Sequence, residues 1–304
     1  MNNQTIENKF CACLGSDNVK RDEPMSKHTT FRIGGPADFY LCPHSVKELT
    51  AAIDICRQEN LPFFILGNGS NLLVSDKGYR GAVIQIWKNL SHIHREGRVI
   101  HAQAGALLSK IAAQALEQGL TGMEFAAGIP GTLGGAVVMN AGAYGGEMKD
   151  ILKEVEVITV QGEILTLNKE ELKLGYRTSI VKEKGYIVLS ASMELALGER
   201  EEIRKTMEEL KQKRVDKQPL DMPSAGSTFK RPEGYFAGKL IMDAGLRGFS
   251  IGGAQVSEKH CGFVVNKGDA TAADVKALIQ EVQRQVKEKF GVTLETEVKF
   301  LGEF

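Results

Sequence analysis

Residues 126–136 read AAGIPGTLGGA, with four glycines and one proline between Gly128 and Gly135. Proline fixes one backbone turn, and the glycines around it let the backbone approach a ligand closely. Phosphate oxygens are bound by converging backbone N–H groups, which such a loop can supply. A glycine-rich crossing between packed elements is the alternative interpretation, because short glycine motifs are weak signals by themselves.

A second glycine-rich loop precedes this one in the chain. The apolar stretch 63–66, FFIL, predicts a buried strand that runs directly into the loop 67–71, GNGSN. No helix pattern starts at Leu72, as a Rossmann fingerprint requires, and the loop lacks the lysine of a P-loop. A tight structural turn remains an alternative for this loop alone. Together, the two loops favour a clamp that holds a dinucleotide diphosphate through backbone amides rather than lysines.

The predicted cofactor contacts come from both loops and from 140–145, NAGAYG, where small residues leave room for a flat ligand. These contacts are Gly67, Asn68, Gly69, Ser70, Asn71, Gly128, Ile129, Pro130, Gly131, Thr132, Gly134, Gly135, Asn140, Gly142 and Gly145.

Composition and charge narrow the class of protein. The chain has 304 residues, 42% of them apolar and 25% charged, which is typical of a soluble globular protein with two or three domains. Lysine plus arginine equals aspartate plus glutamate at 38 each, so no general nucleic-acid surface is expected. The five cysteines match no zinc pattern and predict reduced thiols, with no metal site. No signal peptide or membrane span is visible, which predicts a cytoplasmic protein that binds no membrane.

Helical and strand patterns alternate along the chain, which predicts an α/β or α+β plan. Ser45 and Glu48 have the spacing of a helix capping box. The densely charged stretch 199–214 marks a domain boundary, and 292–301 ends in a late strand. The sequence also predicts strands at 37–42 and 187–197, a strand-rich stretch at 82–104, and a hairpin of 155–160 with 164–167. A polar leader is expected at 1–25, and helices are expected at 45–58, 109–118 and 270–290.

Six motifs in order resemble those of the UDP-N-acetylenolpyruvoylglucosamine reductases, flavoproteins that make UDP-N-acetylmuramate for peptidoglycan. The resemblance covers nearly all of residues 28–301. The motifs are HTTFRIGGPA at 28–37, LGNGSNLL at 66–73, AGIPGTLGGAVVMNAGAYG at 127–145, GYRTS at 175–179, AGSTFKRP at 225–232 and LETEV at 294–298.

The resemblance implies an α+β fold: an FAD-binding domain of the vanillyl-alcohol-oxidase type with two α+β subdomains, followed by a third, α/β domain for the substrate. The corresponding boundaries are 1–85, 86–212 and 213–296, with a last strand at 297–304 that returns to the first subdomain. It further implies non-covalent FAD, with NADPH as the reducing co-substrate. The segment after Arg177 is short, so the chain resembles the second subtype, which lacks a tyrosine-bearing insertion.

Three catalytic residues follow from the resemblance. Arg177 suits stabilisation of the negative charge that builds on the substrate carboxylate, because its planar fork binds carboxylates. Ser227 matches the family's proton donor. Glu297 matches the third catalytic residue, and period-two alternation places it on one strand face with Glu295 and Lys299. The alternative for that face is simple solvation.

The predicted substrate contacts are cationic or polar residues near the boundary of the third domain, together with the neighbour of Arg177. They are Tyr176, Arg214, Lys230, Lys239 and Gln255. Two other functions remain open from the sequence. One is an FAD-dependent alcohol or sugar oxidase on the same fold, which would keep both loops but not the three catalytic residues. The other is a nucleotide-binding module without redox chemistry.

Overall fold

The computed structural model describes residues 3–304, and contacts within the chain group it into two compact units. Unit 1 comprises Met1–Lys20, Tyr40–Gly67 and Ala82–Arg214; unit 2 comprises Arg21–Phe39, Asn68–Gly81 and Val215–Phe304. Both units are assembled from separate stretches of the chain. The three-domain division expected from the sequence stays a prediction.

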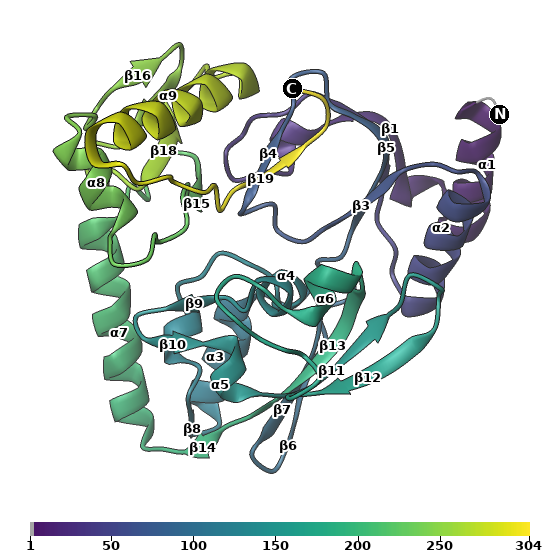
Figure 1. Cartoon of the computed structure of the whole chain (residues 1–304). Helices are drawn as coiled ribbons and strands as arrows, with labels where there is room; N and C mark the ends of the chain where they lie inside the picture. The colour runs from purple at the N-terminus through teal and green to yellow at the C-terminus, as the bar shows by residue number, and fades with distance from the viewer. Residues whose placement is uncertain (1–2) are drawn as a thin grey trace. The chain divides into compact units, whose positions relative to one another are not determined.

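The largest sheet of unit 1 has the strand order β12-β11-β13-β7-β6, and every neighbouring pair is antiparallel (Figure 1). The expected hairpin is its β11–β12 edge, where Val155 lies opposite Leu167. Helices α3 and α4 pack against the sheet. These elements are β6 (Ile93–Glu96), β7 (Val99–Gln103), β11 (Leu152–Ile158), β12 (Ile164–Asn168), β13 (Ile187–Glu194), α3 (Leu108–Glu117) and α4 (Leu133–Met139).

A second sheet has the order β1-β2-β5-β3, and its strand β3 leads directly into the first glycine loop. Strand β3 runs parallel to β5, with Phe63 opposite Ala82, and all four residues of β3 precede Gly67 without a break. The predicted strand 63–66 is therefore confirmed. The strands are β1 (Val19–Pro24), β2 (Pro36–Leu41), β3 (Phe63–Leu66) and β5 (Tyr79–Gln85).

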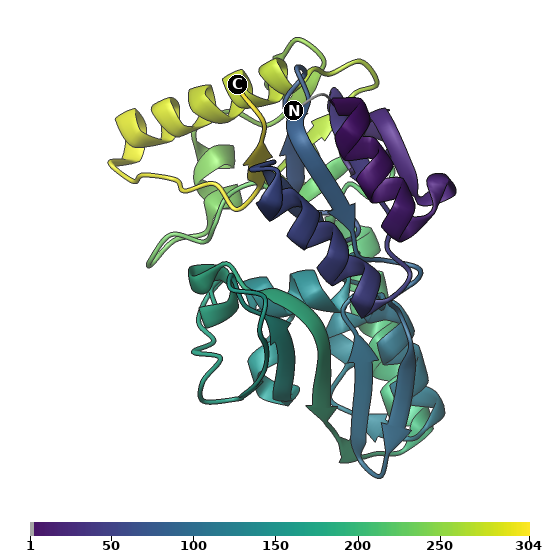
Figure 2. The ribbon, with the colours of Figure 1, turned by 90° about the vertical axis from the view of Figure 1, so that its right-hand side faces the viewer.

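Helices α1 (Asn3–Leu14) and α2 (Val46–Gln58) pack against each other, as Figure 2 shows. The Ser45 side chain accepts a hydrogen bond from the Glu48 N–H, so the predicted helix start is confirmed. Helix α1 was not expected, because the sequence there was interpreted as a polar leader. Its apolar residues Ile6, Phe10 and Leu14 recur at every fourth position and are buried, which gives the helix one core-facing stripe.

The main sheet of unit 2 is antiparallel, in the order β15-β18-β17-β16, and helix α9 packs on β16 and β17. Helix α9 begins after Thr271, whose side chain forms a capping box with Asp274, and it ends at Gly291 with φ 71°. Its apolar face, including Val275 and Leu278, is buried as predicted. These elements are β15 (Ser224–Ser227), β16 (Ser250–Ile251), β17 (Ala254–Val256), β18 (Phe263–Asn266), α8 (Ala237–Asp243) and α9 (Ala272–Phe290).

The C-terminal segment is less regular than the sequence predicts. Only Lys299–Leu301 forms strand β19, which pairs in parallel with β4 (Leu72–Val74) directly after the first glycine loop. Upstream, a single bridge joins Thr296 to Phe229. Leu294 and Val298 are buried and Glu295 is exposed, but Thr296 and Glu297 are both half-buried and Phe300 is exposed. The predicted alternation is therefore only partly kept, and a continuous ladder is absent from 292–298.

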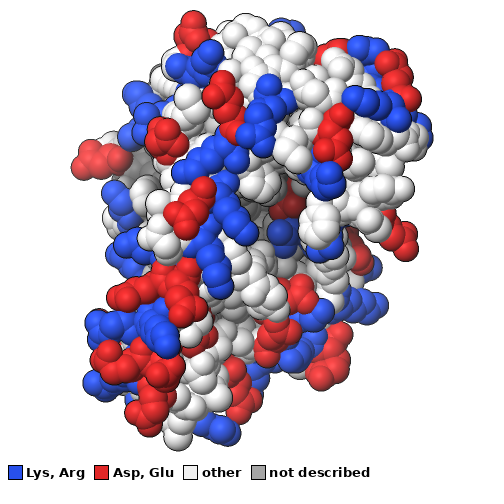
Figure 3. All heavy atoms as spheres, turned by 90° about the vertical axis from the view of Figure 1, so that its left-hand side faces the viewer, with Lys and Arg blue, Asp and Glu red and all other residues white. Residues whose placement is uncertain are grey.

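The charged stretch 199–214 lies in helix α7 (Arg200–Lys217), and Ile203 is its buried residue. Acidic and basic side chains are interspersed over α7, on the face drawn in Figure 3. Among residues 3–304, no helix combines the length and the hydropathy that a membrane span requires. The remaining elements are short: α5 (Met148–Ile151), α6 (Ile180–Lys184), β8 (Leu120–Thr121), β9 (Gly142–Ala143), β10 (Gly146–Glu147), β14 (Ala196–Leu197), and the 3₁₀ turns Ser16–Asn18, Met25–Lys27 and Glu124–Ala126.

Candidate functional site

The two predicted glycine loops meet within unit 1. A Cβ atom placed on Gly67 would lie 2.3 Å from the Oγ1 of Thr132, far inside van der Waals contact. Thr132 itself is 2% exposed, so it has little room to retreat. Glycine at position 67 is therefore required by the approach of the second loop, which brings predicted cofactor contacts from both loops together.

The middle of the first loop needs glycine for a second reason. Gly69 has φ 64°, and a Cβ there would lie 2.0 Å from the carbonyl oxygen of His28. The carbonyl of Gly69 accepts a hydrogen bond from the Thr30 N–H at 3.1 Å. The loop is thus drawn tightly onto the 28–30 segment within unit 2, and its close backbone packing fits a loop that cradles phosphate oxygens.

The backbone N–H groups at the start of α4 are already used within the fold. The N–H of Leu133 donates to Ala106 and that of Gly134 donates to Ala104, each at 2.8 Å. A Cβ on Gly134 would also lie 3.1 Å from the Cβ of Ala104. Gly134 therefore serves the packing of α4, and its predicted contact with the cofactor would have to use its Cα or carbonyl group.

A half-buried guanidinium lies beside the second loop. A Cβ on Gly128 would lie 3.1 Å from Nη1 of Arg214. The Nε of Arg214 is buried and has no hydrogen-bond partner among the described residues, and burial lowers the pKa of this side chain. Leaving such a donor unpaired costs about 1–3 kcal/mol or more. An anionic group bound at Gly128 would supply the missing acceptor, so the residues present fit a diphosphate.

Arg177 lies in a strained turn. Gly175 and Thr178 exchange backbone hydrogen bonds of 3.1 and 3.3 Å, and Arg177 between them has φ 57°. Its carbonyl accepts from the Lys182 ammonium at 3.0 Å, and its guanidinium lies 5.2 Å from the centre of the Tyr176 ring. A left-handed conformation costs a residue with a side chain about 1–3 kcal/mol, and such strain often accompanies function.

Asn140 holds this turn in place. Its side chain is fully buried; the amide nitrogen donates to the Gly175 carbonyl at 3.1 Å and to Glu147 at 3.0 Å, and the amide oxygen accepts from the Lys149 N–H. The sequence predicts Asn140 as a cofactor contact. The structure shows its side chain engaged with the Arg177 turn, so a cofactor contact stays a prediction for its backbone alone.

Ser227 is presented at the end of β15 in unit 2. Gly226, with φ 74°, turns the backbone just before it, and the Ser227 side chain is exposed. The following residue, Thr228, is fully buried, donates its N–H to Gly262 and accepts at Oγ1 from the Val264 N–H, both at 2.9 Å. The hydroxyl of Ser227 thus projects from a well-anchored backbone.

Glu297 lies on the backbone segment next to Ser227. Its N–H donates to the Thr228 carbonyl at 2.8 Å, and its carbonyl accepts from the side-chain amide of Asn71 at 3.2 Å. The Lys299 N–H in turn donates to the Asn71 carbonyl at 3.0 Å. The last residue of the first glycine loop, the Glu297 segment and the Ser227 segment are therefore joined by hydrogen bonds within unit 2.

The predicted substrate contacts of unit 2 do not form one cluster. Lys230 pairs with Glu295 at 2.7 Å, and this hydrogen bond lowers the pKa of the Glu295 carboxyl. Lys239 pairs with Asp243 on the exposed face of α8, and Gln255 donates to the Gly248 carbonyl at 3.0 Å. Lys230 shares the Ser227–Glu297 neighbourhood, whereas Lys239 and Gln255 are engaged elsewhere and their role stays a prediction.

Thr30 is a positioning residue to which the sequence assigned no role. Its N–H donates to Gly69, and its hydroxyl donates to the Ser224 carbonyl at 2.6 Å. One threonine therefore ties the first glycine loop to the strand that carries Ser227. The motif at 28–37 entered the sequence-based predictions only as part of a family resemblance. The residues around Thr30 do not show which distant carbonyl its hydroxyl will reach.

The contact between Gly67 and Thr132 yields a first prediction. Replacing Gly67 with Ala places a methyl group against Thr132 Oγ1, so we expect FAD content to fall and stability to drop by about 1–3 kcal/mol. In the double variant Gly67→Ala/Thr132→Ala the clashing atom is gone, and the lost stability is expected to recover. Flavin absorbance per chain and the denaturant midpoint measure both effects.

Gly97→Ala is the control, because Gly97 is exposed, belongs to neither glycine loop, and a Cβ there would meet no atom within 4 Å. This variant is expected to retain its flavin. Equal flavin loss in Gly67→Ala and Gly97→Ala would show that the approach of the two loops does not govern cofactor binding.

Comparison with known proteins shows the same family resemblance over nearly the whole chain. Residues 37–168 match the family model described as an FAD binding domain, and residues 218–301 match that of the UDP-N-acetylenolpyruvoylglucosamine reductase C-terminal domain. The UDP-N-acetylenolpyruvoylglucosamine reductase of Caldanaerobacter subterraneus subsp. tengcongensis is 60% identical over 300 residues, covering 99% of each chain. That of Lachnoclostridium phytofermentans is 56% identical over 305 residues, covering 99% of this chain and 98% of its own.

Solved structures show a similar fold. The crystal structure of UDP-N-acetylenolpyruvylglucosamine reductase from Thermus caldophilus has a TM-score of 0.81 at 38% identity, over 93% of this chain and 99% of that chain. Alkyldihydroxyacetonephosphate synthase has a TM-score of 0.50 at 18% identity, over 64% of this chain and 40% of its own, and thus shares the fold alone. The predicted α+β fold with an FAD-binding domain of the vanillyl-alcohol-oxidase type is confirmed.

Proposed function

The chain belongs to the UDP-N-acetylenolpyruvoylglucosamine reductase family, and we propose that it reduces the enolpyruvyl ether of UDP-N-acetylenolpyruvoylglucosamine to UDP-N-acetylmuramate. It is an FAD-dependent oxidoreductase, with NADPH as reductant, that acts in peptidoglycan precursor synthesis. NADPH and the UDP-sugar are its small-molecule partners. We propose that the reaction takes place in the cytoplasm.

FAD would be held non-covalently by the two glycine loops, with Gly67 and Gly69 allowing close backbone approach. When bound, FAD carries a hydride from NADPH to the enolpyruvyl double bond. The remaining tasks fall to side chains of this chain: bind the substrate, stabilise the charge that develops on it, and deliver a proton to the adjacent carbon. Arg214 has a buried Nε without a hydrogen-bond partner among the described residues, and it is proposed to bind an oxygen of the substrate diphosphate.

Arg177 is proposed to stabilise the developing charge. As the terminal carbon of the alkene becomes saturated, negative charge spreads onto the substrate carboxylate as an enediolate. A guanidinium binds that carboxylate more strongly as its charge increases, which lowers the barrier rather than only tightening substrate binding. The turn at Gly175–Thr178 limits the backbone freedom of Arg177, so its charge needs little reorganisation during the reaction.

Ser227 is proposed to donate the proton to the adjacent carbon. A serine hydroxyl is a weak acid, but a carbanion-like carbon is a strong base. A proton can therefore pass over a short distance from a fixed serine hydroxyl to that carbon. Glu297 is proposed to assist the enediolate as a carboxyl group on the neighbouring segment. One hydrogen bond supports this assignment. The Glu297 N–H donates at 2.8 Å to the carbonyl of Thr228, the residue that follows Ser227.

A two-step colour change tests the proposed reaction. The purified protein should be yellow, lose its flavin absorbance on anaerobic addition of NADPH, and regain it on addition of UDP-N-acetylenolpyruvoylglucosamine. A colourless protein that binds no flavin would indicate a nucleotide-binding module. Flavin reduction by a sugar or alcohol, followed by reoxidation by oxygen but not by the enolpyruvyl compound, would indicate an oxidase.

A further inference from the structure

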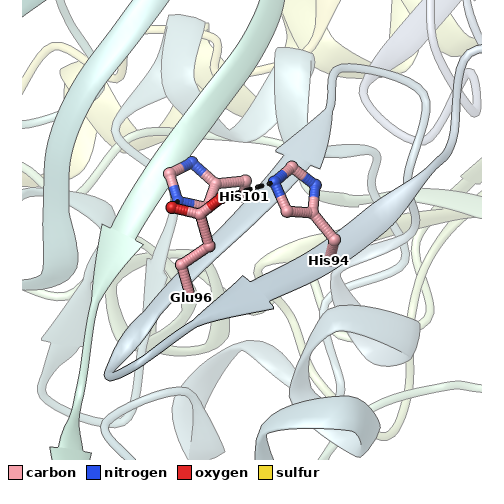
Figure 4. A group of neighbouring side chains, drawn as sticks. All are labelled: His94, Glu96 and His101. Carbon is pink, nitrogen blue, oxygen red and sulfur yellow. Dashed lines mark ion pairs between the residues drawn. The ribbon is translucent and has the colours of Figure 1, made fainter.

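A cluster of metal-ligating side chains lies on the β6–β7 hairpin, and the reductase reaction does not use it. His94 and Glu96 come from β6 and His101 comes from β7, and Figure 4 shows all three gathered on one face of the hairpin. Their nearest ligand atoms all lie within 4.8 Å of one another. The three residues lie within unit 1 and far along the chain from both glycine loops and from Arg177.

Strand geometry brings these side chains together. His94 lies directly opposite His101 in the antiparallel ladder, and Glu96 is two residues from His94, so all three share one face of the pleat. The Nε2 atoms of His94 and His101 lie 3.9 and 4.0 Å from the two carboxylate oxygens of Glu96. The imidazole rings stack at 4.7 Å between centroids.

A hydrogen-bond chain orients His101. Its Nδ1 lies 2.9 Å from Ser192 Oγ, and Ser192 donates its hydroxyl proton to Glu154 Oε1 at 3.2 Å. Because that proton is directed at Glu154, Ser192 can only accept from His101, which places the imidazole proton on Nδ1. The lone pair of His101 then lies at Nε2, on the side of Glu96. This is the arrangement in which a second histidine nitrogen binds a metal while the first is held by a partner.

We propose that this hairpin binds one divalent first-row transition metal ion of the Zn²⁺ class through His94, Glu96 and His101. Two imidazoles and one carboxylate are ligands that Zn²⁺, Ni²⁺ and Cu²⁺ accept, whereas Mg²⁺ and Ca²⁺ prefer oxygen alone. Ligand atoms on a tetrahedral Zn²⁺ are separated by roughly 3.4 Å, given bonds of about 2.0–2.2 Å. The exposed His94 and Glu96 side chains can close the remaining gap by rotation, and water would complete the coordination.

Isothermal titration of the FAD-loaded protein with Zn²⁺ tests the site. We expect a stoichiometry of one ion per chain in the wild type. His94→Ala and His101→Ala are expected to weaken binding by at least about 100-fold through loss of a ligand, and Ser192→Ala by about 10-fold through loss of orientation. Each variant should keep its flavin. His94→Ala should also keep its thermal midpoint in a chelator, because the His94 side chain is exposed.

His44→Ala is the matched control, since it removes an exposed histidine of unit 1 that hydrogen-bonds to Asn18 instead. Its Zn²⁺ affinity should equal that of the wild type. Glu96→Gln keeps the size of the carboxylate and separates ligand loss from any change in the hairpin. Absence of binding in the wild type, or binding that His94→Ala and His101→Ala leave intact because thiols carry it, would overturn the proposal.

Discussion

Ser227→Ala is expected to leave flavin reduction by NADPH within about twofold of the wild type while slowing flavin reoxidation by the enolpyruvyl substrate by about 10²–10⁴-fold. The hydride from NADPH needs no proton from the substrate side, whereas the second half-reaction needs one at the carbon next to the ether. Anaerobic stopped-flow absorbance resolves the two steps in one preparation.

The size of this effect depends on how firmly the hydroxyl is held. Gly226 and Thr228 fix the backbone on either side of Ser227, and the two Thr228 hydrogen bonds are independent of the Ser227 side chain. Removing the hydroxyl should therefore delete the proton donor without moving the strand. Ser227→Cys, which restores a more acidic donor at the same place, should recover part of the rate.

Ser224→Ala on the same strand is the matched control, because the bond from Thr30 uses the Ser224 backbone carbonyl and survives the change. Both half-reactions are expected to stay close to wild type in this variant. If Ser227→Ala slowed both half-reactions equally, the loss would reflect flavin binding or folding, and the proton-donor assignment would fall.

Local sequence patterns predicted most of the secondary structure. The Ser45–Glu48 spacing marked the start of α2, and the apolar period of 270–290 marked α9, because both depend on residues within a few turns of one another. The strand before Gly67 and the turn at Gly69 could also be predicted locally, since an apolar run followed by a glycine-rich turn has few structural outcomes. Helix α1 was missed because its polar residues outweighed a stripe of three apolar ones.

Long-range partners could not be predicted from the sequence. Asn71 reaches the Glu297 carbonyl across 226 positions, and Thr30 reaches the Ser224 carbonyl across 194. No local propensity encodes which distant carbonyl an amide or hydroxyl will meet, because that choice is made by the tertiary fold. For the same reason, the sequence did not show that the Asn140 side chain holds the Gly175 carbonyl; its cofactor contact stays a prediction for the backbone.

Arg177→Lys is expected to lower kcat by about 10²–10³-fold, nearly all of it in flavin reoxidation by the enolpyruvyl substrate. Lysine keeps the positive charge but loses the planar fork that binds both carboxylate oxygens at once. It also keeps the strained backbone, because the exchange of hydrogen bonds between Gly175 and Thr178 does not involve the side chain. Arg204→Lys, on the exposed surface of α7, is the matched control and should be silent.

The division of this loss between kcat and KM decides what Arg177 does. An arginine that binds the carboxylate equally before and during the reaction would, when replaced, raise KM and leave kcat unchanged. An arginine that responds to the growing enediolate charge would lower kcat and kcat/KM together, since its binding strengthens only in the transition state. Unchanged kcat with a raised KM in Arg177→Lys would therefore assign Arg177 to substrate binding alone.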